Sequence, residues 1–358
     1  MHYRPANKGK MRRPLGPSSV GSKAPYRQKG AALIIAMLVF AISTALVVAM
    51  KSEFTRFFAR SANILLAEQA HSYLRGAEEL AAMALIADYD KDKETGIPKD
   101  DLAEEWALTR PPFALDDGGW MSGSLEDLQG RFNLNALAKP VAKNSKDRFT
   151  ASQEVFIRLL QALEEPSVSQ HEAELITQAV SDWLDADSKP LPDGAEDDYY
   201  YSRDPAHRTG NRPMASPSEL LAVAYMTPEI YQALLPVITV WPQEPEDKWL
   251  NFHTAPPLLL RALNGDKNLS PLSEGDGDVL QQERDEIGFA DKAAFLKNSV
   301  FGNSQGTMKR AGGLLRQTSS WFLLRAEVDL ADRNMRLYSV LERGNRRVDT
   351  VVRASGSL

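Results

Sequence analysis

The sequence predicts an α+β protein in which a long amino-terminal helix packs on a small antiparallel sheet, with a large all-helical domain inserted into that sheet. The apolar run that begins at Ala31 continues into helix-forming sequence as far as about Tyr89, without a proline. Alternating apolar and polar residues in 319–354 are typical of strands, and 118–133 resembles a strand with a Gly-Gly entry followed by a second short strand. Between these two regions, residues 140–312 have the periodicity of helices.

The helix begins as an apolar segment that lies close to the amino terminus. Residues 31–50 form a run of twenty residues without a charge, preceded by the basic sequence RQKG. A secretory signal has a shorter apolar core of about 7–15 residues and then a small-residue cleavage site, and this segment has neither feature. Twenty residues are near the length that crosses roughly 30 Å of hydrocarbon. The residues alone therefore predict a single-pass membrane anchor at 31–52, continuous with a helix on the order of 90 Å long.

Charge is distributed unevenly along the 358 residues. The first 30 residues carry eight Lys or Arg and no acidic residue, whereas residues 31–358 carry 34 basic and 48 acidic residues, a net charge of −14. A basic flank before an apolar helix stays on the cytoplasmic side, so the domain that follows should face outward. An acidic domain of this kind repels nucleic acid, and the lack of cysteine excludes disulfides and thiolate chemistry.

Gly30 stands directly between the basic leader and the apolar helix. This arrangement resembles the prepilin cleavage site of type IV pilins and pseudopilins, which also fold as a long helix on a small antiparallel sheet. The resemblance implies that a prepilin peptidase removes the leader 1–30 by cutting between Gly30 and Ala31. It also implies that the new amino terminus is methylated and that the helix is kept as an anchor.

Ile35 stands where the pilin pattern has a different residue, and this difference predicts where the subunit sits in the filament. The family usually has Glu as the fifth residue after the cut, where it pairs with the amino terminus of a neighbouring subunit, and here that residue is Ile35. A carboxylate without a partner in lipid or in a helix core is costly. Its absence implies a subunit that never docks beneath another one, at the tip of the filament.

The remaining elements divide the chain further. Residues 53–139 are expected to hold the rest of the helix and the first strands, including a short second strand that ends at Asn133. Residues 140–312 form the inserted helical domain, in which Ser, Thr and Asp mark the helix starts. Residues 313–358 return to the sheet as strands separated by hairpin turns with the sequences ADRN and RGNR.

Two stretches carry a more specific resemblance. They are DLQGRFNLNAL, from Asp127 to Leu137, and the acidic sequence from Asp182 to Leu220. Together with Ile35 and the insertion, they resemble the minor pseudopilin K family of the type II secretion system. The resemblance implies a non-enzymatic subunit that initiates and caps the pseudopilus at its tip, and so supports export of folded proteins across the outer membrane.

The same resemblance implies a location and a set of partners. The chain would pass once through the bacterial inner membrane, with its amino terminus in the cytoplasm and its carboxy-terminal domain in the periplasm. Other minor pseudopilins would pack against its helix and sheet. The projecting domain could also contact secreted cargo or the outer-membrane secretin.

An acidic cluster is the best candidate for a site. Seven Asp or Glu residues lie within the seventeen residues 182–198. Oxygen ligands on a flexible loop suit calcium, although the spacing is not that of an EF-hand, and a solvated acidic loop is the alternative. The resemblance implies a structural calcium ion in the inserted domain, and the expected ligands are Asp185, Asp187, Glu196 and Asp197. A weaker candidate is Glu274 to Asp278, which is more often a plain turn.

Two other classes of function compete with this interpretation. The sequence FHTAPPLLLRAL, together with FNLNAL, resembles half of a helix-hairpin-helix and predicts a membrane-anchored protein that binds or takes up DNA. Helical packing with the Leu residues in a core is the alternative, and the acidic charge of residues 150–300 favours it over DNA contact. The sequence GNSQG matches the nucleophile elbow of hydrolases at Ser304, but that elbow needs a preceding strand and a later His, and no His follows His253. We therefore expect neither nucleic-acid binding nor catalysis.

Overall fold

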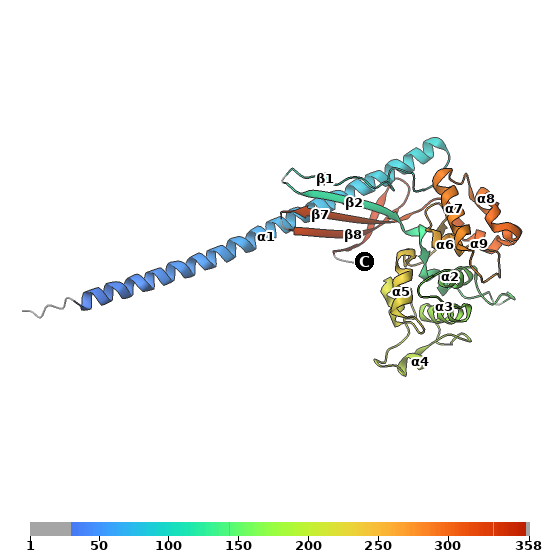
Figure 1. Ribbon diagram of the computed structural model, residues 1–358, viewed down its shortest axis with the longest axis horizontal. Coiled ribbons are helices and arrows are strands. Elements are labelled where there is room, and N and C mark those ends of the chain that lie inside the picture. The colour runs from blue at the N-terminus through green and yellow to red at the C-terminus, as the bar shows by residue number, and fades with distance from the viewer. Residues whose placement is uncertain (1–29, 117, 143, 332, 356–358) are drawn as a thin grey trace, which may run out of the picture. The chain divides into compact units, whose positions relative to one another are not determined.

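The computed structural model describes residues 30–116, 118–142, 144–331 and 333–355 (Figure 1). By its internal contacts the chain divides into two units, residues 1–65 and 66–358, and each is described by itself. Helix α1, Ala31–Thr95, contributes to both units. Gly96 follows its last residue and caps it in the left-handed conformation, with a φ of +70° and a hydrogen bond from its N–H to the Asp92 carbonyl oxygen (3.0 Å). The predicted uninterrupted helix is confirmed and extends six residues beyond Tyr89.

The first unit contains the apolar part of α1. Its large side chains are exposed on all sides, and α1 is the one helix in the described part of the chain that is long and apolar enough to cross a membrane. Just beyond the apolar run, the rings of Phe54 and Phe58 make an edge contact with centroids 4.6 Å apart. The predicted leader at residues 1–29 lies outside the described residues.

The second unit contains a five-stranded antiparallel sheet with the order β1-β2-β7-β8-β9. Its strands are β1 (Phe113–Ala114), β2 (Trp120–Asp127), β7 (Trp321–Leu330), β8 (Arg333–Arg343) and β9 (Val348–Ala354). The pairing of β2 with β7, from Trp120 opposite Asp329 to Asp127 opposite Phe322, joins segments about two hundred residues apart in the sequence. The predicted sheet and both predicted hairpins, β7–β8 and β8–β9, are confirmed.

One face of this sheet is covered by the part of α1 that belongs to the second unit. Alternate residues of β7, beginning with Phe322 and Leu324, pack against Leu74, Ala81 and Leu85 of the helix. This alternation is what a strand with one buried face requires.

A buried carboxylate also joins α1 to the sheet. Glu78 of α1 accepts hydrogen bonds from Ser339 (2.8 Å), Thr350 (2.8 Å) and Arg353 (2.6 Å). Burial alone would raise the pKa of Glu78, but these hydrogen bonds outweigh it and hold the pKa at about 2. Glu78 is therefore ionised throughout the physiological range and fixes the helix against β8 and β9.

The inserted region gathers at one end of the sheet (Figure 1). It is mainly helical, with one continuous apolar core that extends in sequence from Phe132 to Leu315. Two short parallel strand pairs, β3–β4 and β5–β6, lie within it. Its elements are η1 (Leu128–Gly130), β3 (Phe132–Asn133), η2 (Leu134–Ala138), α2 (Ala151–Gln161), α3 (Gln170–Leu184), α4 (Asp197–Tyr201), η3 (Pro217–Ala222), α5 (Pro228–Leu234), η4 (Leu235–Val237), β4 (Ile238–Thr239), β5 (Leu250–Asn251), α6 (Pro257–Arg261), α7 (Glu274–Glu286), α8 (Lys292–Leu296), η5 (Ser299–Thr307), α9 (Lys309–Gly313) and β6 (Leu315–Arg316).

The boundaries of the insertion differ from the expected 140–312. Strand β3, predicted as a second strand ending at Asn133, does form, but it pairs with β4 of the inserted region and not with the main sheet. The physical reason is burial: the Phe132 ring stacks on Phe156 at 5.0 Å and meets the edge of Trp249 at 5.0 Å. The chain therefore leaves the sheet at Asp127, and residues 132–138 pack in the core of the inserted region.

Candidate functional site

The acidic loop begins where α3 ends. Asp185 is the carboxy-terminal cap of α3, and its Oδ1 accepts a hydrogen bond from the Asp187 N–H (3.1 Å). Asp187 repeats this turn by accepting from the Lys189 N–H (2.8 Å). The loop is held from beneath by Asp182, which is fully buried and accepts from the Leu191 N–H (3.1 Å). Short Asp side chains that bond to their own backbone thus shape the loop.

Gly194 lets the loop fold back over Asp182. A Cβ atom at this position would lie 1.8 Å from Asp182 Oδ2, so no other residue fits without a shift. Burial, and next to it the charges of Asp185 and Glu196, raise the pKa of Asp182 to about 7. The loop therefore concentrates negative charge around a carboxyl group that water does not reach.

Three carboxylates meet on this loop. Asp185, Asp187 and Glu196 each offer an oxygen, and these three oxygens lie within 4.8 Å of one another. None of the three forms an ion pair with any Lys or Arg that the structure describes. Burial is the first cause that raises the pKa of both Asp185 and Glu196, followed by the neighbouring carboxylates. Bound protons or a bound cation would relieve the repulsion among these carboxylates.

Glu196 adds a buried oxygen to this group. Its side chain is buried, and its Oε2 accepts a hydrogen bond from Thr209 Oγ1 (3.1 Å). Its Oε1 is buried without a hydrogen-bond partner among the described residues, and the same holds for Oδ1 of Asn211, two residues after Thr209. Buried oxygen acceptors without donors are costly unless an ordered water or a cation supplies the missing partner. A hard cation with oxygen ligands, such as calcium, fits this donor set.

The structure brings together three of the four expected ligands. Asp197 is the exception, because its Oδ1 accepts from both the N–H (3.0 Å) and the Oγ1 (2.8 Å) of Thr209. These bonds lower the pKa of Asp197. Asn211 was not foreseen from the sequence; its positive φ of 46° puts it among the few non-glycine residues in the left-handed region. The weaker candidate, Glu274 to Asp278, is not a turn but the first turn of α7, capped by Ser273.

The expected processing and assembly residues lie at the start of α1. The Gly30 carbonyl oxygen accepts a hydrogen bond from the Ile34 N–H (3.2 Å), and Ala31 is the first residue of the helix. Ile35 follows in the first turns, with 60% of its surface exposed. The helix is thus already formed at the residue that would become the amino terminus.

An apolar groove in the second unit is a further candidate surface. It has a volume of about 620 Å³ and lies between α1 and β2, closed by the segment 105–113. Its helix side consists of small residues, Ala77, Ala81 and Ala84, whereas Leu80 and Phe113 are largely exposed. Small residues on a helix permit close approach of another backbone, so this groove suits a packed protein element.

Comparison with known proteins gives the family. A sequence model described as "Type II secretion system (T2SS), protein K" matches residues 130–243. The chain is 34% identical over 320 residues to type II secretion system protein K of Pseudomonas aeruginosa, covering 88% of this chain and 89% of that one. The chain belongs to the type II secretion system protein K family. It is also 31% identical over 338 residues to the Klebsiella pneumoniae protein K, covering 92% and 97% of the two chains.

The fold agrees with this membership. A chain in the crystal structure of the GspK–GspI–GspJ complex from enterotoxigenic Escherichia coli matches with a TM-score of 0.69 and 25% identity, covering 84% of this chain and all of that chain. The resemblance that rested on Asp127–Leu137 and Asp182–Leu220 is confirmed, since the family match overlaps the first stretch and contains the second. This family member is a minor pseudopilin of the type II secretion system.

In this protein K family member, the two competing motifs have ordinary structural settings. Leu259 and Leu260, in the sequence that resembles a helix-hairpin-helix, are fully buried in the core, as the packing interpretation predicts. The sequence around Ser304 belongs to η5, and the element before η5 is the helix α8. The strand that a nucleophile elbow needs directly before its Ser is therefore replaced by a helix.

Proposed function

We propose that this protein K family member is a non-catalytic subunit that initiates the pseudopilus and caps it at its tip, and so supports export of folded proteins across the outer membrane. Two features of the chain support this role. The position at which pilins carry a carboxylate is Ile35, which cannot pair with the amino terminus of a subunit above. The region 128–316 is inserted between β2 and β7. It makes this subunit too wide for the close packing of subunits in the shaft of the pilus.

The partners in this proposal are other minor pseudopilins. The matched crystal structure is of a complex with GspI and GspJ, and by analogy two such subunits would pack against α1 and the 620 Å³ groove of this chain. The exposed apolar helix would anchor the subunit in the inner membrane, with residues 66–358 in the periplasm. The inserted region would then project free, where secreted cargo or the outer-membrane secretin could contact it.

Ile35→Glu tests the tip assignment. The substitution places a carboxylate in an apolar helix segment, at a cost on the order of 2–3 kcal/mol unless it is paired. If no subunit sits above this one, the carboxylate has no partner, and incorporation into the pilus should fall or stay unchanged. The measurement is the amount of this chain along sheared pseudopili and at their ends, by immunogold labelling, with secretion assayed in the same cells.

Ile34→Glu is the matched control, because it introduces the same charge one residue away from the position that pilins use. The two variants should behave alike. Greater incorporation of the Ile35→Glu chain along the shaft than of the Ile34→Glu chain would show that the missing carboxylate, and not the inserted region, keeps the subunit at the tip.

We also propose that the acidic loop binds calcium as a structural ion. Asp185, Asp187 and Glu196 would hold it, with Asn211 offering a further oxygen on the neighbouring segment. When bound, the ion supplies positive charge that balances the cluster and satisfies oxygens that have no donor. The side chains of Asp182 and Thr209 keep the loop folded around that position.

The calcium proposal predicts a shift in thermal stability. An ion that binds only the folded state stabilises it by about 2.7 kcal/mol at a hundredfold excess over Kd. The full chain in detergent should therefore melt at a higher temperature in calcium than in chelator, as followed by tryptophan fluorescence. Asp187→Ala combined with Glu196→Ala should remove most of this difference, whereas Asp198→Asn, in the first turn of α4 and outside the cluster, should keep it. Equal melting temperatures in both buffers, with no metal found by elemental analysis, would contradict the proposal.

A further inference from the structure

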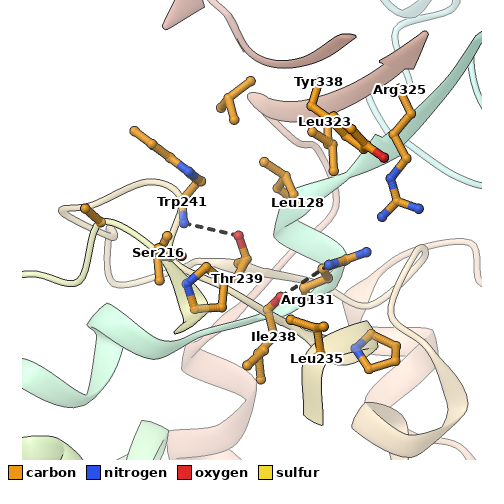
Figure 2. Close-up of a pocket in the computed structure, with 15 residues that line it drawn as sticks. Leu128, Arg131, Ser216, Leu235, Ile238, Thr239, Trp241, Leu323, Arg325 and Tyr338 are labelled. Carbon is orange, nitrogen blue, oxygen red and sulfur yellow. Dashed lines mark hydrogen bonds between the residues drawn. The ribbon is translucent and has the colours of Figure 1, made fainter. Parts of the chain in front are cut away.

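A second groove lies between the inserted region and the main sheet (Figure 2). Its β7 residues alternate with Phe322 and Leu324, which pack on α1, so it lies on the opposite face of the sheet. Its volume is about 460 Å³, within the range of sites that bind ligands or anchor side chains. On the sheet side it is lined by Leu323, Arg325, Tyr338 and Val340. On the other side lie segments around Ser216 and Trp241 of the inserted region. The groove is separate from the acidic loop and from the groove beside α1.

The floor of this second groove is apolar and fixed in place. Leu128, Leu323 and Val340 form a small core cluster of their own, each with 6% or less of its surface exposed. Trp241 lies at one end, where its ring stacks on Trp321 with centroids 5.8 Å apart. The hydrogen bond from the backbone N–H of Trp241 to Thr239 Oγ1 (3.1 Å) holds this segment in position. A preformed apolar surface of this kind can accept a side chain without first reorganising.

The other end of the groove carries an excess of positive charge. Figure 2 shows the guanidinium groups of Arg131 and Arg325 on the same side of the groove. Both share one carboxylate: Arg131 Nε donates to Glu126 Oε1 (2.5 Å), and an Nη of Arg325 lies 3.0 Å from Glu126 Oε2. Two guanidinium groups and one carboxylate leave a local charge of +1 in a chain that is otherwise acidic.

Arg325 retains the capacity to bind a further anion. About half of its side chain (49%) is exposed, and Glu126 is its one ion-pair partner among the described residues. The Tyr338 hydroxyl, which Figure 2 shows beside Arg325, has no hydrogen bond to the part of the chain that the structure describes. An arginine and a phenol donor next to an apolar floor are suited to a carboxylate attached to an apolar group.

We propose that this groove binds an extended peptide segment of a partner protein, with a large apolar side chain over Leu128 and one adjacent carboxylate at Arg325. The composition of the lining favours a protein over a lipid, because Trp, Tyr and Arg are the residues that dominate the energy of protein interfaces. The local positive charge in an acidic surrounding selects a single carboxylate next to an apolar residue over a strongly acidic segment. The site does not depend on the calcium loop or on Ile35, so this proposal and the proposed function can fail separately.

The test is calorimetric titration of the full chain in lipid nanodiscs with the peptide acetyl-Gly-Phe-Leu-Glu-amide. We expect saturable binding, weakened about tenfold or more when the peptide carries Gln in place of Glu, because a charge-assisted hydrogen bond is lost. Arg325→Glu should weaken binding of the acidic peptide by a similar factor. Ala215→Trp, an exposed position at the edge of the groove, should block it without disturbing the core.

Arg346→Glu is the matched control, since Arg346 is exposed and pairs with Asp90 away from the groove. That variant should bind the peptide like the unaltered chain. Equal binding by Arg325→Glu and Arg346→Glu, or no saturable binding at all, would overturn the proposal. Tighter binding of laurate than of the peptide, competing for the same site and abolished by Ala215→Trp, would assign the groove to a lipid and overturn the peptide assignment.

Discussion

Gly30→Ala should leave the chain at full length, with its basic leader attached, and should stop secretion. The resemblance to the prepilin cleavage site places the cut between Gly30 and Ala31, and a methyl group at the residue before the cut hinders a peptidase that requires glycine there. The substitution should not affect the fold, because an added Cβ at Gly30 meets no atom within 4 Å. The effect therefore isolates recognition by the peptidase from stability. Mass spectrometry of the amino-terminal peptide, from membranes of cells that express each form, measures the outcome.

Gly76→Ala is the matched control. Gly76 also lies in α1 and also has open space around it, so its substitution should leave processing unchanged and stabilise the helix by roughly 0.5–1 kcal/mol. The unaltered chain should begin at Ala31 and carry a methylated amino terminus. An unaltered chain that begins elsewhere, or a Gly30→Ala chain that is cut as usual, would contradict the processing assignment.

The main elements of the fold were predictable because their patterns are local. The period of the strands in 319–354 and the turn sequences between them specify β7, β8 and β9 without reference to the rest of the chain. The α1 helix is likewise predicted by a long run of helix-forming residues without a proline. Strand β3 was assigned to the wrong sheet because two residues carry no information about their partner. Only the ring contacts of Phe132 with Phe156 and Trp249 decide it, and these residues are distant in sequence.

The sequence predicts the loop of the candidate calcium site and most of its carboxylates, but not the full set of ligands. A dense run of Asp and Glu located the loop, and three of the four expected carboxylates meet there. The sequence does not show that Asp197 lies outside the cluster whereas Glu196 lies in it. Thr209 donates to an oxygen of each residue, and only the structure shows that Glu196 keeps a second oxygen without a donor. Asn211 and the groove at Arg325 depend on contacts between segments far apart in the chain, which no local pattern reports.

Arg343 neutralises two buried carboxylates where α1 packs on the sheet. Arg343 of β8 is almost fully buried and binds Asp88 of α1 (2.8 Å) and Asp100 (2.5 Å). It also donates to the Ser319 carbonyl oxygen (2.8 Å). Burial, and next to it the charge of Asp100, raise the pKa of Asp88 to about 6 even with Arg343 present. One guanidinium group thus balances two carboxylates that have little access to water.

Arg343→Met should lower the free energy of unfolding by about 3–5 kcal/mol at neutral pH, because two buried carboxylates lose their cation. The loss should shrink as the pH falls from 8 to 5. A carboxyl group whose pKa is higher in the folded than in the unfolded state binds more protons when folded, so stability falls as the pH rises and recovers on acidification. Urea unfolding of the full chain in detergent, followed by tryptophan fluorescence at both pH values, measures this.

Adding Asp88→Asn and Asp100→Asn to Arg343→Met should restore part of the stability and flatten its pH dependence. Arg346→Met, which removes an exposed pair with Asp90, should cost no more than about 1 kcal/mol, and an Arg343→Met chain that behaves like it would show that the buried cluster does not hold α1 to the sheet.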